Sequence, residues 1–255
     1  MLHHLTTGTP RPGTPPLLIA HGLFGSARNW RAIARRLGNE RLMISVDMRN
    51  HGESPRADSQ GYHDMAADLA EVIGAHGGRA DVLGHSMGGK AAMVLALTRP
   101  ETVRRLIVAD IAPVAYGHGN THRALIAAMQ ALDPAAFATR AEADTALVRH
   151  VDDPAIRAFL LQSLDTQDGR WRLNLDVLSR ELERITGWPD PAGRFEGPAL
   201  FIAGSRSDYI RPEHRTAIKA LFPAARFVKI PGAGHWLHAE RPREFSETVR
   251  AFLDA

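Results

Sequence analysis

Short aliphatic runs alternate with longer segments of helical periodicity along most of the chain, and this alternation constrains the fold more than any other feature of the sequence. Strands that alternate with helices form a mostly parallel sheet with helices on both faces. We therefore predict an α/β fold. The aliphatic runs predict strands at residues 17–20, 42–47, 80–84, 106–110, 199–203 and 226–230, and apolar residues spaced three and four apart predict helices at 27–37, 62–76, 87–98, 212–221 and 242–253.

The alternation stops between residues 114 and 196, where helical patterns follow one another without an evident buried strand. This change indicates a helical lid (residues 114–196) inserted into a core built from residues 1–113 and 197–255. A chain of 255 residues with 44% hydrophobic content is long enough to bury one such core. Within the insertion, Asp/Pro and Gly/Asp turns separate predicted helices at 122–132, 134–150, 154–164 and 173–185.

Composition and charge exclude several classes of protein. The chain has no cysteine, which excludes disulfides, thiolate metal ligands and a cysteine nucleophile. The net charge is only +3, and basic residues lie among acidic ones instead of forming the stripe that favours nucleic acid. No apolar run resembles a secretion signal or is long enough to span a membrane. We expect a cytoplasmic protein with no nucleic-acid partner, no cofactor and no metal site; the sequence makes no prediction of oligomeric state.

The most informative motif is Gly84-His85-Ser86-Met87-Gly88, because it stands between a predicted strand and a predicted helix. A G-x-S-x-G turn in that context presents its serine at the carboxyl edge of the sheet in a strained conformation with positive φ. Glycine on both sides lets the strand and the helix approach closely. We predict that Ser86 is a nucleophile, and we interpret His85, which points away from it on the turn, as structural.

The segment His21-Gly22-Leu23-Phe24-Gly25-Ser26 follows the first predicted strand, and its glycines let the backbone bend toward the serine. We expect the backbone N–H of Leu23 to form an oxyanion hole with that of Met87, at the start of the next helix. Two such donors stabilise the negative charge that develops in acyl transfer. Phe24 is an alternative donor or a wall of the pocket.

Among thirteen histidines, His235 is the best candidate for a general base. It follows the last predicted strand in the sequence Pro-Gly-Ala-Gly-His-Trp and precedes the final helix, so that its loop can face Ser86 across the sheet edge. A histidine there takes the serine proton during attack and returns it to the leaving group. We interpret His238, at the start of the last helical region, as a packing residue.

Two aspartates compete for the role of orienting His235. Asp110 ends one predicted strand, and Asp208 follows a later one. Many enzymes of this fold take the acid from the later loop, three positions after a glycine, where this chain has Ser207. We favour Asp110, because it ends a buried strand whereas Asp208, one position late, can point outward. Ser207 is a candidate hydrogen-bond bridge to His235.

Five motifs form a set: His21-Gly-Leu-Phe-Gly-Ser26, Asp47-Met-Arg-Asn-His-Gly-Glu-Ser54, Gly84-His-Ser-Met-Gly-Gly-Lys90, Asp110-Ile-Ala-Pro113 and Gly232-Ala-Gly-His-Trp236. On these motifs the chain resembles the α/β-hydrolase superfamily over nearly its full length. It is most similar to a branch of small bacterial esterases and acyl-thioesterases related to the mitochondrial α/β-hydrolase-domain proteins. In that branch the acid resembles Asp110, and a serine stands at the position of Ser207; Asp208 is a departure that keeps the assignment open. The loop at 47–54 is interpreted as scaffolding beside the pocket, with no metal-ligand geometry.

Apolar side chains of the predicted lid are suited to holding an acyl chain over Ser86, although most of them are also expected to form the core of the lid itself. Three polar residues near its entrance, His118, His122 and Arg123, could meet a polar leaving group or a carrier's phosphate, but we favour solvated surface. We assign to the substrate pocket Met129, Trp171 and Trp188 from the lid, and Phe24 and Trp236 from the core.

The residues and the resemblance together imply a serine carboxylesterase. It would cleave small short-chain carboxylic esters, and also acyl thioesters, through an acyl-Ser86 intermediate. The same residues would serve lactone, amide, carbon–carbon or perhydrolytic chemistry. A ligand-binding protein with this fold and little turnover is a further alternative, and the intact set of serine, histidine and glycines argues against it.

Overall fold

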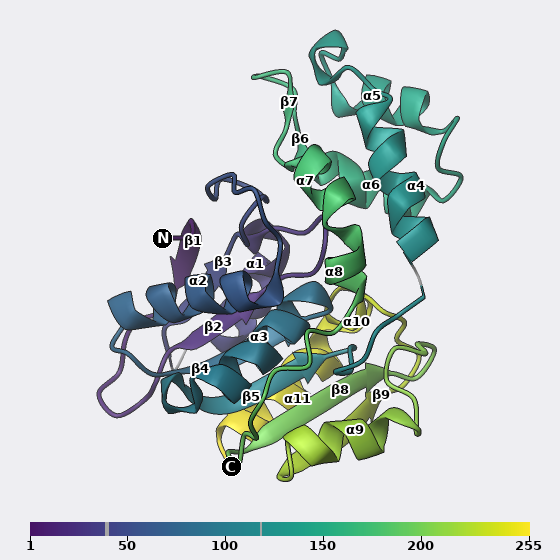
Figure 1. Cartoon of the computed structure of the whole chain (residues 1–255). Coiled ribbons are helices and arrows are strands. Elements are labelled where there is room, and N and C mark those ends of the chain that lie inside the picture. The colour runs from purple at the N-terminus through teal and green to yellow at the C-terminus, as the bar shows by residue number, and fades with distance from the viewer. Residues whose placement is uncertain (39–40, 118) are drawn as a thin grey trace.

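A twisted, mostly parallel sheet forms the centre of the molecule (Figure 1). The structure is a computed structural model that describes residues 1–38, 41–117 and 119–255, so His118 lies outside the described residues. Within them the strand order is β1-β3-β2-β4-β5-β8-β9, with β1 antiparallel to β3 and the other neighbours parallel. This confirms the predicted α/β fold. The strands are β1 (His4–Thr7), β2 (Leu17–Ala20), β3 (Met43–Val46), β4 (Ala80–His85), β5 (Val103–Ala109), β8 (Ala199–Gly204) and β9 (Ala225–Ile230).

The first strand, β1, was not predicted from the sequence. Its four residues, His-Leu-Thr-Thr, contain one aliphatic side chain, and none of them is fully buried. It lies at the edge of the sheet and pairs only with β3. An edge strand of this kind lacks the apolar run by which the buried central strands are recognised in a sequence.

Alternate side chains of the strands pack against two layers of helices. Leu17 and Ile19 belong to the core under α1 (Arg31–Leu37) and α11 (Pro242–Leu253). Leu18 and Ala20 point to the opposite face, where α2 (Tyr62–Ala75), α3 (Met87–Thr98) and α9 (His214–Leu221) pack. Because successive side chains of a strand point to opposite faces, both faces of these strands are apolar and must be covered. Short helices η1 (Ala27–Trp30), η2 (Pro100–Thr102) and α10 (Leu237–Glu240) complete this part.

Residues 119–186, between β5 and β8, form a mainly helical lobe at one end of the molecule, and the chain then runs back along the main body to β8 (Figure 1). No buried strand is evident in this segment from the sequence, but the structure contains a small antiparallel hairpin that pairs β6 (Leu164–Asp165), which is buried, with β7 (Arg170–Trp171). Strands of two residues are too short to show a periodic pattern. The helices are α4 (Gly119–Gln130), η3 (Pro134–Ala136), α5 (Arg140–Leu147), α6 (Pro154–Leu160), η4 (Leu161–Ser163), α7 (Leu175–Arg180) and α8 (Leu182–Thr186).

The predicted helix at 134–150 is divided into η3 and α5. The Asp133 carboxylate accepts the N–H of Ala135, and the Thr139 hydroxyl accepts the N–H of Glu142, so two separate helix starts are capped within seven residues. Between the two helices the backbone is extended at Phe137. Local side-chain caps therefore interrupted a segment that is otherwise helical in its apolar spacing.

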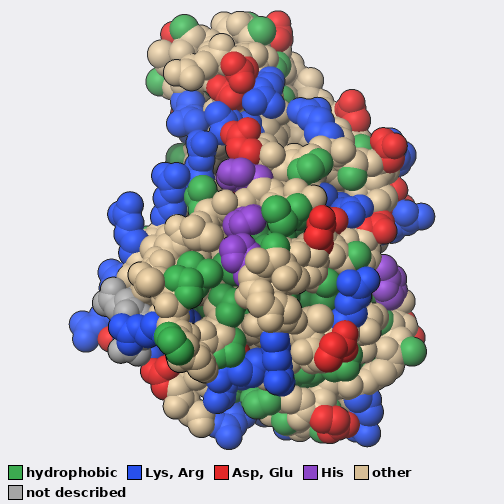
Figure 2. Space-filling model, turned by 90° about the vertical axis from the view of Figure 1, so that its left-hand side faces the viewer, with side chains coloured by type: hydrophobic (Ala, Val, Ile, Leu, Met, Phe, Trp, Pro, Cys, Tyr) green, Lys and Arg blue, Asp and Glu red, His purple; other side chains and the backbone are tan. Residues whose placement is uncertain are grey.

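The surface of the molecule carries charges of both signs. Figure 2 shows a narrow upper lobe above a broader body, and Asp and Glu side chains lie beside Lys and Arg on both. Among the described residues, no helix has the length and hydropathy needed to cross a membrane.

Candidate active site

Ser86 lies in a sharp turn between β4 and α3. Its backbone has φ 51° and ψ −119°, a strained conformation for a residue other than glycine. A Cβ added to Gly84 would lie 2.2 Å from the carbonyl oxygen of Gly88, and one added to Gly88 would lie 2.4 Å from that of Ala20. The two glycines are therefore required by the close approach of strand and helix, as the sequence motif predicted.

Asp110 follows β5 directly and is fully buried, with φ 52°. One carboxylate oxygen, Oδ1, accepts the N–H of Gly204 at 3.1 Å. The other, Oδ2, lies 2.8 Å from Nδ1 of His235, in the turn after β9. Because β5, β8 and β9 are neighbouring parallel strands, their carboxyl ends bring these groups together. A proton on Nδ1 donated to Asp110 leaves Nε2 of His235 free to accept one.

Asp208 lies outside this arrangement. Its side chain is 61% exposed and forms an ion pair with Arg211 at 2.8 Å. Ser207 does not bridge to His235 as considered from the sequence. Its hydroxyl donates instead to Oδ2 of Asp110, the same oxygen that faces His235. Ser207, and not Asp208, thus contacts the Asp110 carboxylate.

Aromatic side chains enclose the His235 ring. Tyr209 stacks on it with ring centroids 4.0 Å apart and an angle of 19° between the planes. Burial, with the nearby Asp110 carboxylate, raises the pKa of Tyr209 to about 12, so the phenol stays neutral. Nε2 of His85 lies 2.9 Å from the carbonyl oxygen of His235, and the centroids of the two rings are 4.7 Å apart. Burial and the neighbouring histidines hold the pKa of His85 well below its usual range, so that neutral His85 donates to that carbonyl and supports the loop.

His238 packs beneath this loop, in agreement with the interpretation from the sequence. Its ring is stacked on Trp30, with centroids 4.2 Å apart. Burial, with His235 nearby, lowers the pKa of His238 to about 3, so the ring is neutral. Its Nδ1 atom is buried and has no hydrogen-bond partner among the described residues.

Met87 and Leu23, the two residues predicted to form an oxyanion hole, come from separate segments. The N–H of Met87 belongs to the first turn of α3, where the first amides have no acceptor within the helix. Leu23 lines both cavities that contain Ser86. Phe24 is not available as a donor, because its N–H bonds to Nε2 of His51 at 3.3 Å. Phe24 is only 5% exposed and belongs to the hydrophobic core.

The loop at 47–54 positions the segment that carries Leu23. The Asp47 carboxylate accepts the N–H of Ala27 at 2.7 Å, and Nε2 of His21 accepts the N–H of Met48 at 2.9 Å. Burial alone would raise the pKa of Asp47, but the amide hydrogen bonds outweigh it and lower the pKa, so the carboxylate is charged. Burial lowers the pKa of His51 to about 3, which keeps this ring neutral and able to accept the bond from the Phe24 amide.

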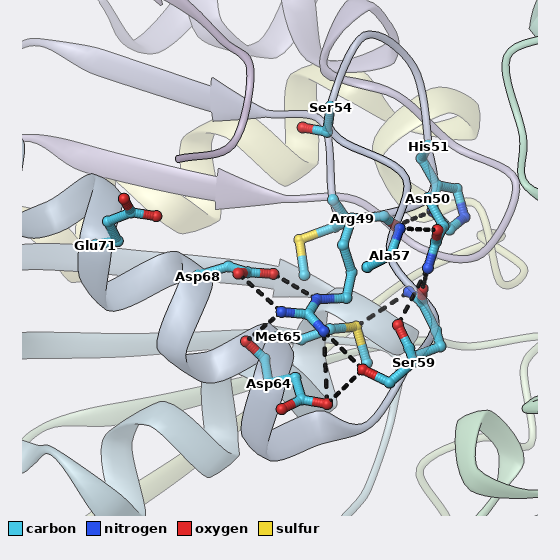
Figure 3. A network of polar contacts seen from close by, with 12 residues as sticks. Arg49, Asn50, His51, Ser54, Ala57, Ser59, Asp64, Met65, Asp68 and Glu71 are labelled. Atoms are coloured by element: carbon cyan, nitrogen blue, oxygen red, sulfur yellow. Dashed lines mark hydrogen bonds and ion pairs between the residues drawn. The ribbon is translucent and has the colours of Figure 1, made fainter. Parts of the chain in front are cut away.

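Figure 3 shows how the same loop is tied to α2. The Arg49 guanidinium makes two bonds to the Asp68 carboxylate, at 2.6 and 2.9 Å, and a third to the Ser59 hydroxyl at 2.9 Å. The Asn50 amide nitrogen donates to Oε1 of Gln60 at 2.8 Å. Its amide oxygen accepts a hydrogen bond at 2.9 Å from Asn174, which precedes α7. The polar residues of this loop are thus engaged in structural contacts, as expected from the sequence.

Two cavities meet at Ser86. The cavity of about 490 Å³, here called the His235 cavity, is lined by His235, Trp236 and Phe159 among others. The cavity of about 360 Å³, here called the Lys90 cavity, extends along α3 to α8 and is lined by Lys90, Tyr62, Tyr116 and Ile185 among others. Leu23 and His122 line both. Ser86 therefore lies where the two cavities adjoin.

Of the five predicted pocket residues, only Trp236 lines one of these two cavities. Trp188 packs against the core, and the other three are buried in it, namely Phe24, Met129 and Trp171. Hydrophobicity in a sequence does not distinguish a lobe's own core from a cavity wall. The sequence favours solvated surface for both His122 and Arg123. Arg123 is exposed, but His122 lines both cavities.

Sequence reasoning missed Lys90 and the three tyrosines of its cavity, Tyr62, Tyr116 and Tyr209. A signal for Lys90 was present, because it is a lysine in an otherwise apolar helix, one turn after Ser86. The tyrosines come from separate elements and meet only in the fold. No cluster of three or more side chains suited to hold a metal ion occurs in the described ranges.

A parallel sheet with a serine at the turn from its central strand to a helix, and with a histidine and a buried carboxylate at the same edge, defines the α/β-hydrolase class of fold. The comparisons agree. The family model for the alpha/beta hydrolase fold matches residues 15–242, and the chain belongs to this family.

Its relatives include named esterases and lipases. The mouse (Mus musculus) protein sn-1-specific diacylglycerol lipase ABHD11 is 42% identical over 94% of this chain and 81% of its own length. The Escherichia coli K12 protein Esterase YbfF is 40% identical over 94% of this chain and 93% of its own. A solved structure titled Marine microorganism esterase matches with a TM-score of 0.93 and 40% identity, covering 98% of each chain.

Proposed function

We propose that this α/β hydrolase is a serine carboxylesterase that cleaves short-chain carboxylic esters, and also acyl thioesters, through an acyl-Ser86 intermediate. The observation that carries the proposal is the contact of His235 with the fully buried Asp110 carboxylate. His235 also lines the same cavity as Ser86, whose backbone is strained. The esterase and lipase relatives support ester bonds as the target.

The reaction follows from the roles of the three side chains. His235 Nε2 takes the proton of the Ser86 hydroxyl as Oγ forms a bond to the ester carbonyl carbon. Asp110 holds the Nδ1 proton of His235 and stabilises the imidazolium. The bond to the leaving oxygen then breaks, and His235 gives that oxygen its proton. Water attacks the acyl-enzyme with His235 again as base, and the acid and free Ser86 are released.

The tetrahedral intermediates carry a negative oxygen that needs hydrogen-bond donors. We assign this role to the backbone N–H groups of Met87 and Leu23, and each is worth about 3 kcal/mol of transition-state stabilisation. The bond from the Phe24 amide to His51 supports Leu23 over Phe24 as the donor.

We also propose that residues 114–196 act as a lid over the site. Phe159 from α6 and Ile185 from α8 contribute to the two cavities that meet at Ser86, one to each. A lid of this kind excludes water from the charged intermediates. The cytoplasmic location expected from the sequence stays a prediction.

Ser86→Ala tests the proposal. The wild-type protein is expected to hydrolyse p-nitrophenyl butyrate and short acyl-CoA, and to be labelled by a fluorophosphonate probe at Ser86. The variant should lose turnover by about 10³-fold or more, because the hydroxyl is the atom that becomes acylated. Turnover that persists in Ser86→Ala, or a folded wild-type protein inactive on all these substrates, would contradict the proposal. A wider panel with lactones and amides separates the alternative bonds.

A further inference from the structure

Lys90 is a buried cation one helical turn beyond Ser86. It is only 1% exposed, in a helix otherwise composed of small and apolar residues and one threonine. Nζ donates to the carbonyl oxygens of Thr186, at 2.9 Å, and Gly187, at the end of α8, and lies 4.9 Å from the centre of the Tyr116 ring. An ammonium group has three protons, so these two bonds leave one for the cavity that Lys90 lines.

The charge of Lys90 has no carboxylate to balance it among the described residues. No ion pair joins Lys90 to an Asp or Glu there, and none of the residues lining its cavity is acidic. The tyrosines do not supply a balancing negative charge either. Burial raises the pKa of Tyr62 and of Tyr116 well above the usual value and keeps both phenols neutral. Burial lowers the pKa of Lys90 to about 7. A buried ammonium with only dipoles around it is unfavourable, and an anion in the cavity would stabilise it.

The two cavities have different roles if Ser86 and His235 act as proposed. His235 must return its proton to the leaving oxygen, so the leaving group has to lie on its side, in the His235 cavity. The acyl chain then occupies the Lys90 cavity. Lys90 follows Ser86 by four residues and lines the same cavity, so a short acyl chain with its carbonyl at Ser86 extends toward Lys90.

We infer that the Lys90 cavity is an anion subsite that selects acyl chains ending in a carboxylate, so that the enzyme prefers monoesters of short dicarboxylic acids. Lys90 Nζ binds the distal carboxylate while the ester carbonyl lies at Ser86. This inference rests on the proposed function, because the acyl position is defined by the roles of Ser86 and His235.

The test compares two esters of matched shape. Monomethyl succinate ends in a carboxylate, and methyl 4-methylpentanoate carries an isopropyl group in its place. We expect the wild-type kcat/KM to favour monomethyl succinate at least tenfold, through a lower KM. Lys90→Met should reverse or abolish this preference by raising the KM for the anionic ester. Lys229→Met, a change of the same type at an exposed lysine of β9, should retain the wild-type preference.

The outcomes separate this inference from the proposed function. A wild-type enzyme that hydrolyses p-nitrophenyl butyrate but prefers the neutral ester, or has no preference, overturns the anion subsite and leaves Ser86 catalysis standing. The anion subsite is overturned in the same way if Lys90→Met slows both esters equally, since Lys90 would then only tie α3 to the end of α8. The wild-type comparison holds even if Lys90→Met fails to fold. Absence of Ser86-dependent turnover on every ester overturns both proposals.

Discussion

Replacing Asp110 by Asn tests the assignment of the acid most directly, because the structure dictates how the amide must sit. Oδ1 of Asp110 accepts the Gly204 N–H, so the carbonyl oxygen of an Asn must take that position. The NH₂ group then occupies the place of Oδ2, facing Nδ1 of His235 and the Ser207 hydroxyl. The opposite orientation would place two N–H donors against each other at Gly204.

This exchange changes the tautomer of His235. With an NH₂ group opposite Nδ1, that nitrogen must accept a hydrogen bond, and the ring proton moves to Nε2. A His235 protonated on Nε2 cannot take the proton of Ser86. We therefore expect kcat to fall by about 10³ to 10⁴, which corresponds to about 4–5.5 kcal/mol of transition-state stabilisation. The side chain keeps its shape, so the protein should fold.

Asp208→Asn is the matched control. The Asp208 carboxylate pairs with Arg211 on the surface, and such an exposed pair contributes about 0–1 kcal/mol to stability and nothing to His235. The assay is kcat/KM for p-nitrophenyl butyrate at equal protein concentration, with folding checked by circular dichroism. If Asp208→Asn were the more damaging change, or Asp110→Asn kept more than a tenth of the activity, the assignment of Asp110 would be refuted.

Asp81→Ala removes the carboxylate that the buried Arg41 and its neighbour Arg104 share. The free energy of unfolding, measured by chemical denaturation, should fall by about 3–5 kcal/mol. A loss under about 1 kcal/mol would contradict this. His51 and His238 each have a pKa of about 3 in the folded protein, below the usual 6.5, so only the unfolded chain takes up their protons as the pH falls through 6.5. These two residues together should therefore lower the stability by about 2–3 kcal/mol between about pH 7.5 and 5.5, and His85, whose pKa is also held well below its usual range, acts in the same direction. A denaturation midpoint that does not fall over this range would argue against buried neutral histidines.

Much of the fold could be predicted because its signals are local. The central strands are short and mostly aliphatic, and α3 and α11 were predicted with the bounds that the structure has. The hairpin of β6 and β7 and the division between η3 and α5 were missed. These depend on pairs of residues and single caps too short to create a periodic pattern.

The sequence by itself determined the position of Ser86 in the turn, because the contact that requires glycine at 84 is with Gly88 of the same motif and is therefore local. Only the tertiary structure shows that Asp110 lies beside His235 and that Asp208 does not. Both follow strands of the same sheet, and the direction of a carboxylate depends on the N–H of Gly204 and the ring of His235, which come from other strands. The cavity walls were decided in the same way. Lys90 lies near Ser86 because α3 begins directly after that residue, which is a local effect. Its burial, with no carboxylate partner among the described residues, depends on α8 and on tyrosines distant in the chain.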